Sequence, residues 1–176
     1  MTMTDDMTRV IFLDIDGVLN HSNPGEDVYY DVFEGKELAL DQDNINALKK
    51  ILDTVSDAKI VWSTDWRYYD EEKWNRWQNP RLWLEQQDFL KEKIIDKTPQ
   101  KMSSEHFHDI KWWLDQHDNV KKYTILEDSY FPQEWFGLEK HLVQVNPNKG
   151  LTEQDADKAI EILNNIVGDE RHVRRR

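Results

Sequence analysis

Four short apolar runs constrain the fold of this chain more than any other feature. The runs at 10–13, 60–62 and 123–126 are almost continuously hydrophobic, which is typical of parallel strands that are covered on both faces. A fourth run follows at 142–145, and residues 94–95 indicate a weaker fifth strand. The pattern therefore favours a sheet whose strands come from well-separated parts of the chain.

Apolar residues at helical spacing fill the intervals between these runs. We expect helices over about 40–55 and 107–114, and a last helix that ends at Gly168. Asp41 offers a cap to the first helix, and Thr152 begins a near capping box ahead of the last one. Strands that alternate with helices predict an α/β fold, a three-layer sandwich around a mainly parallel sheet.

Two stretches fall outside this alternation. Residues 21–36 contain a Pro-Gly pair and indicate a loop or short hairpin. Residues 66–92 are dense in tryptophan and predict a small helical lid, whose tryptophans are expected to build the lid's own core more often than to stack on bases. We expect one domain, with its core at about 9–65 and 93–168.

Composition excludes several classes of function. The chain has no cysteine, so thiol nucleophiles, disulfides and zinc–thiolate sites are ruled out. Its 23 basic and 35 acidic residues give a formal charge of -12, which repels polyanions, and the basic tail at 171–176 is expected to be a solvated end. No run has the length of a membrane span or the pattern of a secretory signal, so we expect a cytoplasmic protein without a membrane partner.

The segment 12–20 carries the clearest chemical signal. Asp14 and Asp16 follow the first apolar run, and Gly17 next to them permits a tight turn. Two carboxylates this close repel each other unless a divalent cation neutralises them or one of them keeps a proton. Both conditions suit a carboxylate nucleophile beside a general acid. The alternative is that the two acids only cap a turn.

This segment, Asp-Ile-Asp-Gly-Val-Leu, resembles the first motif of the haloacid dehalogenase (HAD) superfamily. The resemblance implies a Rossmann-like sheet and a phosphoryl transfer in which Asp14 is the nucleophile and Asp16 the general acid and base. The run Val-Trp-Ser-Thr-Asp-Trp at 61–66 resembles the second motif and implies that Thr64, rather than Ser63, donates a hydrogen bond to the phosphoryl group. Further substrate contacts are assigned to Gly17, Ser63, Asp65 and Arg67.

Two further motifs are matched less closely. Glu127-Asp128 resembles the acidic fourth motif, which implies a Mg²⁺ site made with Asp14 and Asp16. Asp128 is expected to be the direct ligand and Glu127 to lie behind it. For the basic residue of the third motif, Lys101 is the first choice, and Lys111 and His106 are the other candidates. His106 falls where a related branch has arginine, yet His106 and His108 are expected to be ordinary helix-surface residues.

That related branch is the HAD-like domain of multidomain RNA-repair proteins, and the resemblance spans roughly residues 9–167. It implies a Mg²⁺-dependent phosphomonoester hydrolase, with a nucleotide or another small phosphorylated metabolite as substrate. Two alternatives stay open: removal of a 3'- or 5'-phosphate from a nucleic-acid end, and a catalytically silent binding module. The number of subunits is left open.

Overall fold

The computed structural model describes residues 9–22, 40–68, 79–100, 105–120, 122–129 and 137–165, and the backbone of 32–33 and 36–37. Its main feature is a five-stranded sheet in the order β5-β4-β1-β6-β7, in which every pairing is parallel. The strands are β1 (Arg9–Leu13), β4 (Lys59–Trp62), β5 (Ile94–Lys97), β6 (Lys122–Glu127) and β7 (Leu142–Gln144). All five expected strands are confirmed, and the fold is the expected α/β class.

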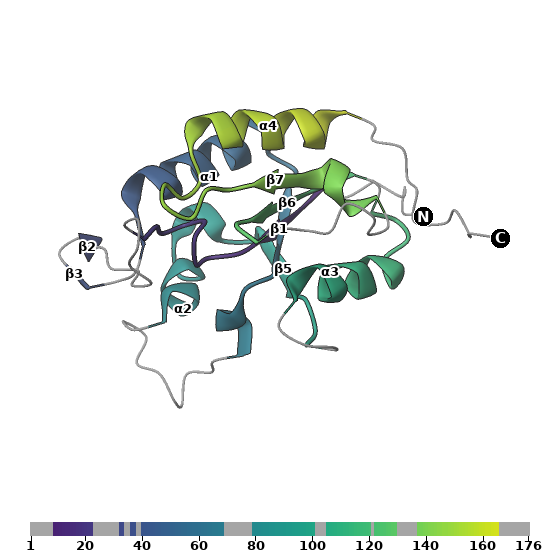
Figure 1. Cartoon of the computed structure of the whole chain (residues 1–176), viewed down its shortest axis with the longest axis horizontal. Coiled ribbons are helices and arrows are strands. Elements are labelled where there is room, and N and C mark those ends of the chain that lie inside the picture. Colours follow the sequence, from purple (N-terminus) through teal and green to yellow (C-terminus); the bar gives the residue numbers. More distant parts are fainter. Residues whose placement is uncertain are drawn as a thin grey trace.

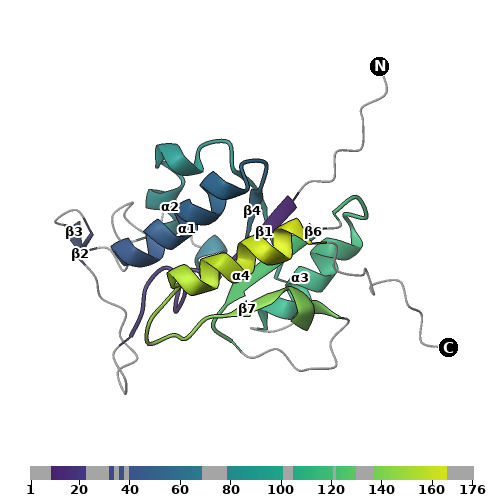
Figure 2. The ribbon, with the colours of Figure 1, turned by 90° about the horizontal axis from the view of Figure 1, so that it is seen from above.

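Helices cover both faces of the sheet. Figure 1 shows α1 (Gln42–Thr54) and α4 (Glu153–Asn164) side by side on one face and α3 (His106–Asp115) on the opposite face. Figure 2, seen from above, shows α4 over the strands with α1 beside it. The chain thus forms the three layers that the alternation predicts.

Each face of the sheet has its own hydrophobic cluster, because side chains alternate along a strand. Ile11 and Leu13 of β1 pack with α1 and α4, whereas Val10 and Phe12 pack with α3. β6 follows the same rule, with Leu126 on the α1–α4 face and Ile125 on the α3 face. This alternation decides which way the next residue of each strand points.

Three helix ends were expected from the sequence, and the structure confirms two of them, the starts of α1 and α4. Asp41 caps α1 by accepting a hydrogen bond from the Asn44 amide at 3.0 Å. Thr152 and Asp155 form a full capping box at the start of α4. The helix ends at Asn164, earlier than expected, because Asn165 is in an extended conformation. Gly168 lies outside the described residues.

The stretch expected to be a lid is described at its ends only, and Trp74 and Trp77 lie outside the described residues. It contains a 3₁₀ turn (Asp65–Tyr68), α2 (Pro80–Leu84) and a second turn (Asp88–Leu90). Trp83 of α2 is buried in the same cluster as α1 and α4. The described part of this stretch therefore extends the main core.

Short elements complete the described chain. A third 3₁₀ turn (Leu138–His141) precedes β7. β2 (Val32–Phe33) pairs antiparallel with β3 (Lys36–Glu37), in and just after the segment expected to be a loop or short hairpin. Among the described helices, none has the length and apolar character needed to cross a bilayer.

Candidate active site

Two acidic residues continue β1 and β6 on the face that carries α3. Leu13 pairs with Leu126, and the Asp14 amide donates to the Leu126 carbonyl at 3.2 Å, so Asp14 and Glu127 come next to each other in the sheet. Phe12 and Ile125 face α3, so the alternation places both carboxylates on that side as well. Asp14 is 4% exposed and Glu127 is 1% exposed.

His106, the first residue of α3, completes this group of side chains. Its Nδ1 lies 2.7 Å from Glu127 Oε2 and 3.9 Å from Asp14 Oδ2, and its Nε2 lies 3.2 Å from Asp65 Oδ1. One ligand atom from each of Asp14, His106 and Glu127 lies within 4.8 Å of the other two. The expectation that His106 is an ordinary surface residue was wrong, because α3 begins directly over the ends of β1 and β6.

Burial makes these acids unusual. Burial, followed by repulsion from Glu127, raises the pKa of Asp14 well above its ordinary value. Burial also raises the pKa of Glu127 to about 8, and contact with Asp128 acts in the same direction. Carboxylates in such a place are stabilised by protonation or by a bound cation.

Asp128 lies against the turn that follows β1. Gly17 has a φ of +77°, and a Cβ at this position would sit 2.4 Å from Asp128 Oδ2. Glycine is therefore required here both by its backbone conformation and by the acid beside it. Asp128 is half-buried and contacts Glu127, so the two residues of the fourth motif both reach the turn that carries Asp14 and Asp16.

Two N–H donors hold the Asp16 carboxylate. Asn20 Nδ2 donates to Oδ1 at 3.0 Å, and the indole Nε1 of Trp66 donates to Oδ2 at 2.9 Å. Asn20 also accepts from the Gly17 amide at 2.7 Å, which closes the turn. Burial raises the pKa of Asp16, while the two donors act in the opposite direction. Sequence reasoning did not identify Asn20 or Trp66, although Trp66 belongs to the segment that resembles the second motif.

The end of β4 brings two hydroxyl groups to the same edge. The Ser63 amide donates to the Leu13 carbonyl at 2.9 Å, so Ser63 lies in the sheet beside Asp14. Ser63 and Thr64 are both fully buried, and the Ser63 hydroxyl has no hydrogen-bond partner among the described residues. The Thr64 hydroxyl accepts from the Trp66 amide at 3.4 Å.

Arg67 and Asp65 form an ion pair at 3.8 Å, but Arg67 is buried and Asp65 is exposed. The guanidinium of Arg67 is 1% exposed and forms an ion pair with Asp109 of α3 at 2.9 Å. It also donates to the carbonyls of Thr64 and Thr98, so its donors point into the protein. Asp65 is exposed and reaches His106. Lys101, the first choice for the third motif, lies outside the described residues, and Lys111 pairs with Asp115 within α3.

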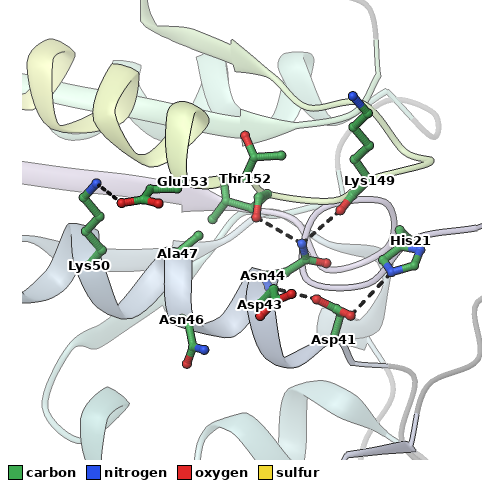
Figure 3. A pocket seen from close by; sticks show the side chains of 11 residues that line it. His21, Asp41, Asp43, Asn44, Asn46, Ala47, Lys50, Lys149, Thr152 and Glu153 are labelled. Carbon is green, nitrogen blue, oxygen red and sulfur yellow. Dashed lines mark hydrogen bonds and ion pairs between the residues drawn. The ribbon is translucent and has the colours of Figure 1, made fainter.

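A separate hollow of about 580 Å³ lies where α1 and α4 begin. The Asn44 side chain donates to the carbonyls of Lys149 and Leu151, each at 3.0 Å. Figure 3 shows Asn44 bonded to Lys149 in this hollow. A Cβ at Gly150, whose φ is +66°, would sit 2.1 Å from Asn44 Oδ1. These contacts fix the loop between β7 and α4, and the lining of the hollow does not include Asp14, Glu127 or His106.

The donor set at the strand ends fits a hard divalent cation. Asp14, Glu127 and Asp128 offer carboxylate oxygens, the ligand type that Mg²⁺ prefers. Burial raises the pKa of both Asp14 and Glu127, and a bound cation would favour their ionised forms. His106 is bonded to Glu127 and thus orients an acid of the site.

Comparison with protein families gives one match, to the model described as the HAD domain in Swiss Army Knife RNA repair proteins, over residues 10–156. Neither the curated proteins nor the solved structures give a match. The matched range contains all the residues of the site described above.

Proposed function

The chain belongs to the family of HAD domains found in Swiss Army Knife RNA repair proteins, and from this premise we propose that it hydrolyses phosphomonoesters through an aspartyl-phosphate on Asp14. Membership of this family indicates a HAD-type, phosphatase-like activity. The observation that supports the mechanism is the convergence of Asp14, Glu127 and His106 from β1, β6 and α3, beside a separately held Asp16.

The proposed reaction has two steps. In the first, a carboxylate oxygen of Asp14 attacks phosphorus, the bond from phosphorus to the ester oxygen breaks, and Asp16 gives its proton to that oxygen. In the second, water attacks the phosphorus of the aspartyl-phosphate, Asp16 takes a proton from that water, and the bond between phosphorus and the Asp14 oxygen breaks. This step releases inorganic phosphate and restores both carboxyl groups to their starting states.

The other residues balance charge on the phosphoryl group. Thr64 supplies a hydroxyl donor, and His106, 3.9 Å from Asp14, stands where the family's third motif has its basic residue. The carboxylates of Asp14 and Asp128, with the main-chain carbonyl of Asp16, would hold Mg²⁺. The ion, when bound, supplies positive charge that offsets the repulsion between nucleophile and phosphate.

We propose a nucleotide or another small phosphorylated metabolite as the substrate, because the chain's charge of -12 disfavours a long polyanion. The second candidate is a phosphate at an RNA end. The description of the matching family, which refers to RNA repair, favours it.

The test is phosphate release from p-nitrophenyl phosphate by the purified chain with Mg²⁺ and with EDTA. We expect release that requires Mg²⁺ and falls by at least about 10³-fold in Asp14→Asn, because the nucleophile is lost. Asp53→Asn, the same change at an exposed position of α1, serves as the control and should keep full activity. A wild-type chain without activity would support the alternative of a silent binding module.

A further inference from the structure

The proposed reaction requires Asp16 to present its proton in one direction, and two different segments hold its carboxyl group. Asn20 lies in the same turn as Asp16, whereas Trp66 comes from the 3₁₀ turn after β4. The two N–H groups bond different oxygens, so together they fix the plane of the carboxyl group. Each oxygen then has its remaining lone pair in a defined direction.

Trp66 is itself held on both sides of its backbone. Its amide donates to the Thr64 hydroxyl at 3.4 Å, and its carbonyl accepts from Arg81 Nε at 3.0 Å. Arg81, on α2, also bonds Glu85 at 2.7 Å, and Trp62 Nε1 donates to the same Glu85 oxygen at 3.0 Å. Hydrogen bonds thus link α2 to the Trp66 backbone, and the indole of Trp66 is bonded to Asp16.

We propose that Trp66 is a positioning residue whose indole N–H orients the Asp16 carboxyl group for proton transfer to the leaving group. The inference rests on the proposed function, since it assigns a role only if Asp16 is the general acid. The ring of Trp66 also packs against the main hydrophobic cluster. The test must therefore separate the hydrogen bond from the packing.

Trp66→Phe removes the indole N–H and keeps an aromatic ring. The measurement is kcat/KM for two esters, p-nitrophenyl phosphate and β-glycerophosphate, at saturating Mg²⁺. The first has a leaving group that departs without a proton, whereas the second must be protonated as its bond to phosphorus breaks. The value of kcat/KM reports only the steps up to and including the first irreversible one. The later role of Asp16 as a base therefore does not affect this measurement.

We expect kcat/KM for β-glycerophosphate to fall by about tenfold or more, and that for p-nitrophenyl phosphate to change by less than about twofold. Trp113→Phe is the matched control, because the Trp113 indole also donates to a carboxylate, that of Asp96, at 2.7 Å. This control should affect the two esters equally. Arg81→Met removes the hydrogen bond to the Trp66 carbonyl. It should therefore also lower kcat/KM for β-glycerophosphate relative to kcat/KM for p-nitrophenyl phosphate.

A double-mutant cycle tests whether Trp66 acts through Asp16. In an Asp16→Asn background, Trp66→Phe should change the ratio of the two kcat/KM values by less than about twofold. An equal loss of kcat/KM on both esters would overturn the role of Trp66, and so would an undiminished change of the ratio in the Asp16→Asn background. In either case, activity that depends on Asp14 would still uphold the proposed function. A wild-type chain that hydrolyses neither ester overturns both.

Discussion

Glu127 and Asp128 are adjacent in the chain but lie in different environments at the end of β6. Glu127 is 1% exposed and its Oε2 lies 2.7 Å from His106, whereas Asp128 is half-buried against Gly17. A carboxyl group that is already hydrogen-bonded to an imidazole is suited to orient a site, and the more open one is suited to bind a cation. Substitution of the two acids is therefore expected to affect Mg²⁺ binding to different extents.

We predict that Asp128→Asn raises the Mg²⁺ concentration for half-maximal activity by more than about 100-fold, because a ligand is lost. Glu127→Gln should raise it by about 10- to 100-fold, the range typical of residues that support a ligand. Phosphate release measured over a Mg²⁺ titration gives both values. The opposite order would assign the ligand role to Glu127.

Single residues also show where the sequence is sufficient and where it is not. Asp14 and Asp16 are recognisable because a distinctive motif, carried by six consecutive residues, surrounds them. His106 is harder to recognise, because histidine stands where the related branch has arginine and its contacts depend on where α3 begins relative to β1 and β6, which is a property of the packed structure. Trp66 was placed among residues expected to form a lid, and only the path of the turn after β4 brings its indole to Asp16.

At the scale of elements, one buried ion pair connects the end of β4 to α3. Arg67 and Asp109 are each 1% exposed, and Arg67 also donates to the Thr64 carbonyl at 2.6 Å. Asp109 lies one helical turn after His106, so the pair ties the segment that carries Thr64 to the helix that carries His106. Loss of the ion pair should disturb both of these segments, at the ends of the sheet strands where the site lies.

We predict that Arg67→Met lowers the free energy of unfolding by about 3–5 kcal/mol, because it leaves the buried Asp109 carboxylate without its guanidinium partner. Urea denaturation followed by circular dichroism gives the value. The double variant Arg67→Met/Asp109→Leu should recover most of the loss, since no unpaired charge remains. A single variant that costs less than about 1 kcal/mol would show that the ion pair contributes little.

The elements themselves follow closely from the sequence where burial dictates residue type. Strands covered on both faces must be apolar throughout, so β1, β4 and β6 were predictable from their runs alone. The end of α4 was not, because apolar residues continue at helical spacing beyond Asn164 while the backbone at Asn165 is extended. The packing of α2 into the main core was missed for a similar reason: aromatic density gives no information on which surface the side chains cover.

The charge of the whole molecule leads to the last prediction, which decides between the two candidate substrates. A formal charge of -12 repels an oligonucleotide, and this repulsion weakens as salt screens it. We expect kcat/KM for a phosphate-ended oligonucleotide to rise between about 50 and 200 mM monovalent salt, at constant Mg²⁺. A nucleoside monophosphate with the same terminal base is the control, and its kcat/KM should change by less than about twofold.

If the chain instead binds the RNA backbone through a local basic surface, released counterions make the oligonucleotide's kcat/KM fall steeply with salt. Such a fall, with the oligonucleotide preferred at low salt, would establish the RNA end as the substrate.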